Sequence, residues 1–172
     1  LPRVDQTSDF HCVTTWTRCS LRWSGFRFLD FYERIVVPGA RPQPDATLVI
    51  LRGEDGYASS LPLADLLADS VLFAERLNGE LLQIEHGAPL RLVAPAHYGY
   101  KSAKHVYGVE FWRDDRNYRS PAFRFMDHPR ARVALEERGR GVPGWFLRYL
   151  YRPLVRPTIL QFRRALDRHR RR

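Results

Sequence analysis

The spacing of apolar residues along the first two thirds of the chain predicts short strands joined by turns, with two helices between them. Residues 28–37 form the clearer helix, because Leu29 and Val36 fall on one face at helical spacing and Pro38-Gly39 then ends it. Clusters of β-branched and aromatic residues, or their alternation with polar ones, predict strands. These strands are expected at residues 10–16, 47–51, 71–76, 81–84, 92–95 and 106–112.

Turn residues separate these elements. Asn78-Gly79 is a strong hairpin signal, because both residue types tolerate positive φ. A second helix is expected over 62–69, with Pro62 in its first turn. Entry, turn, loop or irregular segments are expected at residues 1–7, 23–26, 54–57, 98–104 and 114–124.

The character of the chain changes near its C-terminal end. Arginines alternate there with large apolar residues, which predicts one or two basic amphipathic helices over 143–172, broken by Pro153 and Pro157. The chain is therefore divided into a domain over residues 1–125 and a basic helical extension over 126–172.

The net charge of +9 is unevenly distributed. From Arg138 to the end there are eleven arginines against one acid, Asp167, so this part carries +10 and the rest of the chain is close to neutral. A basic body is thereby excluded, and nucleic-acid binding is not expected. For the extension, three places remain open: docked on the body, which we place first, lying on an anionic membrane surface, or against nucleic acid.

Length and composition suit one globular domain with a sizeable core: 172 residues, of which 44% are hydrophobic. No run approaches the roughly 18 apolar residues of a membrane span. The chain starts with Leu, so we expect a piece of a longer protein. No targeting signal is visible, which favours the cytoplasm.

The stretch Asp9-Phe10-His11-Cys12-Val13-Thr14-Thr15-Trp16 holds one of only two cysteines. Cys12 and Cys19 are too few for a disulfide framework, which indicates a reducing compartment or a ligand role. Cys12 is expected where a strand meets a loop, a usual place for a site residue. From composition alone a buried structural cysteine remains the common alternative.

A second stretch combines small residues with cations. The small residues, which let backbone approach a ligand, are Gly87, Ala88, Gly99 and Ser102. The cations near them are Arg91, Lys101 and Lys104, and His86 can donate a hydrogen bond. Backbone amides with fixed cations suit an anionic phosphate. The glycine spacings exclude a Walker loop and a dinucleotide fingerprint, and a solvated basic loop remains the alternative.

These motifs together resemble the sulfite oxidase family of molybdopterin-dependent oxidoreductases. The resemblance covers residues 1–112 and lies nearer the bacterial branch. It rests on Cys12 within His-Cys-Val-Thr-Thr-Trp, on His-Gly-Ala-Pro-Leu-Arg-Leu-Val from His86, and on Tyr-Gly-Tyr-Lys-Ser-Ala-Lys from Tyr98. Several motifs in the same order are more specific than any one of them.

The resemblance implies an α+β fold, with a mixed curved sheet and peripheral helices around a molybdenum–molybdopterin cofactor. It makes Cys12 the thiolate ligand of the metal and the catalytic residue. His86, Arg91, Ser102, Lys101 and Lys104 would bind the cofactor. The implied activity is oxo transfer between molybdenum and a small-molecule donor or acceptor, with electrons exchanged with a separate redox partner.

The chain also departs from this pattern. Sulfite oxidases of animals and plants carry arginines shortly after the cysteine, where this chain has Thr14 to Thr17 with Arg18 one step late, and Glu75 stands near the place of their active-site tyrosine. A carboxylate would repel sulfite, which favours another substrate. Two features motivate an alternative, a degenerate, cofactor-free binding module of the same fold. One is the substitution at Glu75, and the other is an upstream segment of the longer protein that is expected to be missing from this chain.

Overall fold

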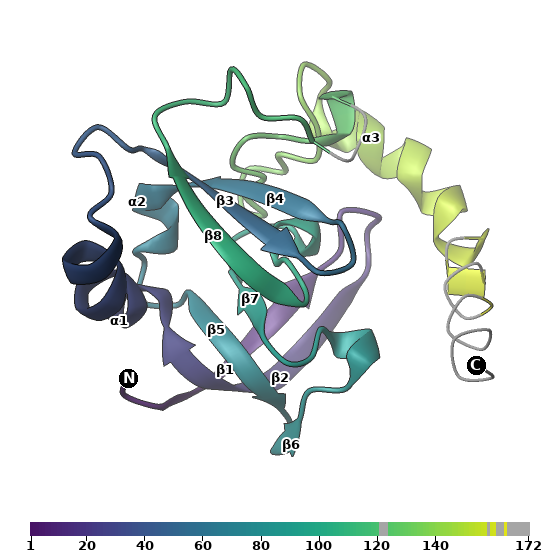
Figure 1. Ribbon diagram of the computed structural model, residues 1–172. Helices are drawn as coiled ribbons and strands as arrows, with labels where there is room; N and C mark the ends of the chain where they lie inside the picture. Colours follow the sequence, from purple (N-terminus) through teal and green to yellow (C-terminus); the bar gives the residue numbers. More distant parts are fainter. Residues whose placement is uncertain (121–123, 158, 161–163, 165–172) are drawn as a thin grey trace.

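The computed structural model describes residues 1–120, 124–157, 159–160 and 164. The strands form two separate sheets, with helices at the periphery (Figure 1). This confirms the α+β class. The strand pairs of the described residues are all antiparallel and are divided between two sheets, so the single mixed sheet that was expected is replaced by two antiparallel ones.

The larger sheet has five strands, in the order β1-β2-β5-β6, with β7 also pairing with β5. Its strands are β1 (Val4–His11), β2 (Thr17–Arg27), β5 (Leu72–Leu77), β6 (Glu80–Leu81) and β7 (Arg91–Val93). The turn between β5 and β6 is the predicted hairpin, with positive φ at Asn78 and at Gly79.

The smaller sheet has three strands in the order β4-β3-β8. They are β3 (Leu48–Gly53), β4 (Ala58–Pro62) and β8 (Val106–Trp112). The predicted bounds of the last strand are confirmed to the residue, because apolar side chains alternate along it.

Helices are short and lie outside the sheets. Helix α1 (Phe28–Phe31) continues as π-helical Tyr32–Ala40, α2 is Leu63–Leu66, and α3 is Gly144–Tyr151. Single 3₁₀ turns occur at Ile84–His86, Gly99–Lys101, Arg124–Met126 and Arg152–Leu154. Within the described residues no helix is long and apolar enough to cross a membrane.

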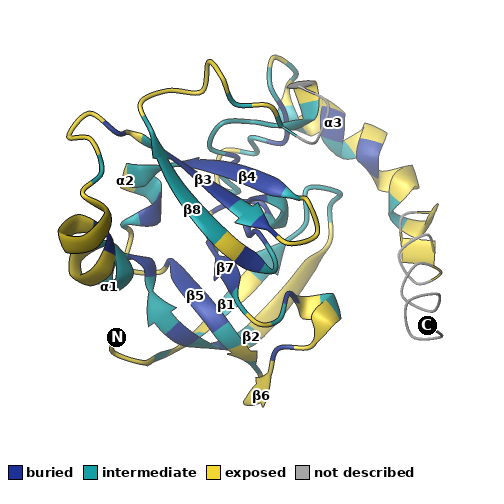
Figure 2. Cartoon of the chain, viewed as in Figure 1, coloured by how far each residue is buried: buried dark blue, intermediate teal, exposed yellow. Residues whose placement is uncertain are grey.

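The strands β5 and β7 of the larger sheet are buried on both sides, and their successive side chains point to opposite sides. Phe73 of β5 and Leu92 of β7 join a core that lies between the two sheets. Their neighbours Leu72, Ala74 and Val93 join a second, smaller core on the other side, together with Trp23. Figure 2 shows β5 and β7 largely buried. Arg91 belongs to this second side, because it pairs directly with Ala74.

The principal error of the sequence prediction lies at the N-terminal end. Residues 1–7 were expected to be an entry segment and 23–26 a turn, but they belong to a long two-stranded ribbon in which Val4 pairs with Gly25. Most side chains of the first half of β2 are exposed, so no apolar pattern marks it. The shortened helix α2 and strand β6 are smaller differences in element ends.

Residues 126–143 wrap around the body rather than extending from it. The guanidinium of Arg130 forms a bidentate ion pair with the carboxylate of Asp65. The backbones of His97 and Arg132 form an isolated antiparallel β-bridge. The imidazole Nδ1 of His128 accepts hydrogen bonds from the backbone amides of Arg130 (3.3 Å) and Ala131 (2.9 Å). Because an amide can only donate, this nitrogen is unprotonated, and its 3.4 Å approach to Glu137 is not an ion pair.

This geometry makes the fold sensitive to mild acid. Burial lowers the pKa of His128 in the folded chain below its usual 6.5, so the unfolded chain binds the proton more readily. The free energy of unfolding is therefore expected to fall as the pH drops below about 6.5. Asparagine keeps a hydrogen-bond acceptor near the same place and does not titrate, so His128→Asn should flatten this fall.

Urea unfolding between about pH 7 and pH 5 checks the prediction, since carboxyl groups with their ordinary pKa values titrate below that window. The pKa values of His86 and His97 are also lowered, chiefly by burial, so part of the pH dependence should remain in the variant. An identical pH dependence in the variant and the wild type would contradict the role of His128.

Candidate active site

Cys12 lies directly after β1, in the tight loop that joins β1 to β2. Two backbone hydrogen bonds close this loop, from Cys12 N to Trp16 O and from Thr15 N to Cys12 O. Thr15 takes a φ of 87°, which a β-branched residue rarely adopts. The thiol of Cys12 is half-buried, forms no disulfide and lies 3.0 Å from the hydroxyl of Thr14. A tight loop thus presents this sulfur at the end of a strand, as predicted.

A residue far along the chain fastens this loop. Arg138 is buried and donates a hydrogen bond of 2.5 Å from Nη1 to the carbonyl of Val13. Its guanidinium also lies over the ring of Tyr98, 4.8 Å from the centroid, which adds a cation–π attraction. Arg138 therefore ties the Cys12 loop to the beginning of the 98–104 loop.

Gly99 brings the two predicted stretches into direct contact. A Cβ built on Gly99 would lie 2.3 Å from Cε1 of Phe10 and 3.3 Å from the carbonyl oxygen of His11. Real Cβ atoms do not approach so closely, so only glycine fits against the end of β1. The second stretch thus packs against the residues immediately before Cys12.

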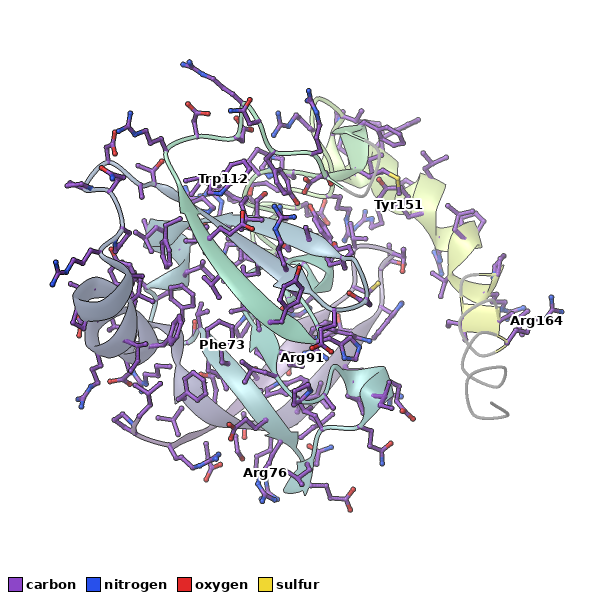
Figure 3. The ribbon with its side chains drawn as sticks, viewed as in Figure 1. Phe73, Arg76, Arg91, Trp112, Tyr151 and Arg164 are labelled. Atoms are coloured by element: carbon purple, nitrogen blue, oxygen red, sulfur yellow. The ribbon has the colours of Figure 1, made fainter. Side chains whose placement is uncertain are left out.

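Arg91 is the most unusual group of the site (Figure 3). It is 4% exposed, and its guanidinium lies beside the neighbouring rings of Phe10 and Trp23, 5.2 and 5.1 Å from their centroids. It donates to the carbonyls of His86 (2.9 Å) and Ser102 (3.5 Å). Among the described residues no carboxylate pairs with it. Burial lowers the pKa of Arg91 to about 10, so it remains charged at neutral pH.

Lys104 and His86 lie beside Arg91 and form with it the Arg91 cluster, in which Lys104 supplies a second positive charge. The ammonium of Lys104 donates to the carbonyl of Glu85 at 2.5 Å. Burial, and next the charge of Arg91, lower the pKa of Lys104, while burial and then Lys104 lower that of His86. Gly87 fits beside the side chains of Lys104 and Arg91 with a φ of +100°, and a Cβ there would lie 2.9 Å from the side chain of Lys104. These cations raise one another's cost of burial, which a bound anion would offset.

Ser102 and Lys101 serve other contacts. Ser102 is buried, and its hydroxyl accepts a hydrogen bond from the amide of Ala94 at 3.3 Å. Lys101 is fully buried, and its ammonium donates to the carbonyl of Ser60 and the carboxylate of Asp127, both at 2.9 Å. The structure does not bring this ammonium to the Arg91 cluster. Lys101 instead holds the 98–104 loop against β4 and the segment at Asp127.

Glu75 is paired with a cation outside the cluster. It lies at an irregularity of β5, where Gly25 pairs with Ala74 and Ser24 with Arg76, so that Glu75 has no directly paired residue on β2. Its carboxylate forms an ion pair of 2.5 Å with Arg3. Since this ion pair offsets the charge of Glu75, it weakens the argument that Glu75 repels an anionic substrate.

These observations test whether a molybdopterin cofactor fits the site. The cofactor needs a thiolate for its metal, and the free, half-buried Cys12 offers one. It also needs cations and hydrogen-bond donors for an anionic phosphate, and Arg91 supplies both. Arg91 Nε and the indole Nε1 of Trp23 are among the buried polar atoms that find no hydrogen-bond partner within the described residues. Native proteins rarely leave such donors unpaired, so the residues present fit the group.

Sequence patterns did not reveal two contributors to this site. Arg138 was counted only as part of a basic tail, and its role depends on a contact 125 positions away along the chain. Trp23 was assigned to a turn, although its ring lies beside the guanidinium of Arg91. The only available signal for Trp23 was its size and aromatic character.

The fold agrees with the class of molybdopterin-dependent oxidoreductases. Residues 1–119 match the family described as oxidoreductase molybdopterin binding domain, and the chain belongs to that family. The predicted molybdenum cofactor is thereby confirmed as that of the family. The structure is similar to the sulfane dehydrogenase SoxCD from Paracoccus pantotrophus, with a TM-score of 0.54 over 66% of this chain and 33% of that one; at 22% identity this likeness shows the fold.

Three similar proteins come from bacteria. The chain is 42% identical over 114 residues to the uncharacterized oxidoreductase YuiH of Bacillus subtilis, covering 66% of this chain and 55% of that protein. It is 30% identical to a putative protein-methionine-sulfoxide reductase subunit, YedZ1, of Azospira oryzae, over 66% and 44%. It is 25% identical to the protein-methionine-sulfoxide reductase catalytic subunit MsrP of Ralstonia nicotianae, over 80% and 48%. The chain thus spans about half the length of these relatives.

The close contact at Gly99 yields a stability prediction. Gly99→Ala must push Phe10 or the chain at His11 aside, and overpacking of this kind costs about 1–3 kcal/mol of the free energy of unfolding. The matched control is Gly39→Ala, because a Cβ at Gly39 meets nothing within 4 Å. The control should be neutral or stabilising, by up to about 1 kcal/mol. Urea unfolding of both variants measures the difference, and equal effects would refute the contact.

Proposed function

We propose that this chain holds a molybdopterin cofactor between Cys12 and the Arg91 cluster, and that it catalyses oxo transfer to or from a small substrate. The observation that carries the proposal is the buried Arg91. It has no carboxylate partner among the described residues, and it touches Phe10, two residues before the free thiol of Cys12. An unpaired buried cation is costly, and an anionic cofactor supplies the missing negative charge.

Each residue has a distinct part in this proposal. Cys12 provides the thiolate to the metal, and its short loop sets the direction of the sulfur. Arg91, Lys104 and His86 hold the cofactor's anionic end, with Ser102 and its neighbouring backbone at the same place. Lys101 and Arg138 do not touch the cofactor in this scheme; they position the loops that do.

When bound, the cofactor would exchange an oxygen atom with the substrate while its metal cycles between Mo(VI) and Mo(IV). Electrons would pass to or from a separate protein. Two of the relatives carry the word subunit in their names, which supports an arrangement with a partner. The cofactor-free module is the weaker alternative, because it leaves the buried charge of Arg91 without a counter-ion among the described residues and because Glu75 is already paired with Arg3.

The two cysteines give a matched test of the metal ligand. Cys12→Ser should remove most of the molybdenum, because a serine hydroxyl does not offer the soft thiolate that the metal prefers. Cys19→Ser should retain it, since Cys19 is exposed on β2. Inductively coupled plasma mass spectrometry on the full chain, expressed with molybdate in a host that makes the cofactor, gives the metal content per chain.

The wild type and Cys19→Ser are expected near one molybdenum per chain. Equal retention in the Cys12 variant would remove this residue as the ligand. A wild-type protein that folds but carries no molybdenum in such a host would instead support the cofactor-free module.

The Arg91 cluster can be tested without the metal. Inorganic pyrophosphate should raise the melting temperature of the cofactor-free chain, because a ligand that binds only the folded state stabilises it. Arg91→Met should lose this response. The variant removes the charge and the donors but retains a long side chain against the rings of Phe10 and Trp23. Arg116→Met is the control, because its exposed guanidinium pairs with Asp114 on the surface.

Thermal melts at several pyrophosphate concentrations measure the response. An equal shift in the wild type and in Arg91→Met would place anion binding outside the cluster and contradict its proposed role.

A further inference from the structure

Helix α3 and the residues after it carry a large exposed apolar surface. Trp145, Phe146, Tyr149 and Leu150 are 58%, 50%, 62% and 51% exposed. Their spacing of one and four residues places them on one side of the helix. The surface continues beyond the helix with Leu154, Ile159 and Leu160, which are 47%, 42% and 53% exposed. Monomeric soluble proteins rarely expose a contiguous apolar surface of this kind without using it.

The opposite side of α3 already has its partner. Leu147 and Tyr151 are 1% and 2% exposed, and a Cβ on Gly139 would lie 2.5 Å from Leu147. Arg148 adds an ion pair of 3.4 Å with Glu136. Figure 2 shows the helix banded between buried and exposed residues, and Figure 3 shows Tyr151 on it. Contact with the body therefore accounts for one apolar side of α3 and leaves the other without a partner among the described residues.

Charge identifies the kind of surface that would cover the exposed side. The 35 residues from Arg138 onward carry eleven arginines and one acid. Arg152 and Arg156 are exposed, and neither forms an ion pair within the described part of the chain. In a symmetric pair of identical chains the same arginine-rich surface would face itself, and like charges would repel. The surface requires a partner that is negatively charged and accepts aromatic and aliphatic side chains.

We propose that α3 and residues 152–157 and 159–160 lie flat on the surface of an anionic lipid bilayer. Trp145, Phe146 and Leu150 enter the region between headgroups and acyl chains, while the arginines remain at the level of the anionic headgroups. Because the same helix docks on the body through Leu147 and Tyr151, the body is held at the membrane. This inference does not depend on the cofactor.

The position of the helix gives this attachment a consequence for the active site. A groove of about 480 Å³ separates the helix from the Cys12 loop, with Thr15 and Trp16 on one wall and Tyr149, Arg152 and Arg156 on the other. Figure 1 shows the β1–β2 loop beside the C-terminal helix. The Cys12 loop would therefore lie close to the lipid surface.

The test is co-sedimentation of the full chain with phosphatidylcholine vesicles, with and without phosphatidylglycerol. The chain is expected to bind the vesicles that contain phosphatidylglycerol and to be released by salt. The double variant Arg152→Gln with Arg156→Gln should lower the partition coefficient by roughly 25-fold, since each arginine near an anionic surface adds about five-fold. Its control is Arg113→Gln with Arg116→Gln, which removes the same charge from side chains that are 67% and 85% exposed.

A second pair of variants tests the apolar contribution. Trp145→Ser with Leu150→Ser should lower binding by roughly ten-fold or more. Its control, Ile35→Ser with Val37→Ser, removes two apolar side chains that are 53% and 46% exposed on the π-helical segment and should bind as the wild type does.

Three outcomes would overturn the proposal. One is equal binding to the two kinds of vesicle, and another is an equal loss in the variants and their controls. The third is absence of vesicle binding together with a dimer that dissociates in Trp145→Ser with Leu150→Ser, which would assign the surface to a second copy of the chain. Circular dichroism verifies that each variant is folded. Urea unfolding verifies that the substitutions on and near α3 have not lowered the free energy of unfolding of the body.

Discussion

A buried positive charge without a negative partner among the described residues is the constraint on which the site depends. Arg91 lies on a strand of only three residues, beside Phe10 and Trp23 of the smaller apolar core, and is 4% exposed. Two carbonyls and two aromatic rings hold its guanidinium, which is less than a charge usually receives when it leaves water. The chain tolerates this cost at the point where its two chemically distinctive stretches meet. A site that takes an anion explains why the cost is retained.

The geometry around that charge depends on contacts between distant parts of the chain. Gly99 permits the 98–104 loop to touch the end of β1, and Lys101 anchors the same loop from behind. Arg138 holds the Cys12 loop, and its neighbour Glu136 holds α3 through Arg148. The thiol loop and the C-terminal helix are therefore attached to the same short segment. Residues beyond the family match at 1–119 thus help to position residues within it.

Sequence patterns predicted the elements that alternate and missed those that do not. Strand β8 and the Asn78-Gly79 turn were predicted because alternation and positive φ have local causes. The β1–β2 ribbon was missed because its polar, exposed residues form a strand only through pairing with residues 6 to 21 positions away. The division into two antiparallel sheets was also hidden, since periodicity indicates strands but not their partners.

The two lysines of the 98–104 loop show the same limit for the candidate site. Lys101 and Lys104 are three positions apart and were assigned the same role. The ammonium of Lys101 donates to Ser60 and Asp127. The ammonium of Lys104 donates to the carbonyl of Glu85, within the Arg91 cluster. The cause is the 3₁₀ turn at Gly99–Lys101, which rotates the first lysine inward before the chain straightens. Sequence motifs locate such a loop, whereas the direction of each side chain is set by backbone geometry and distant partners.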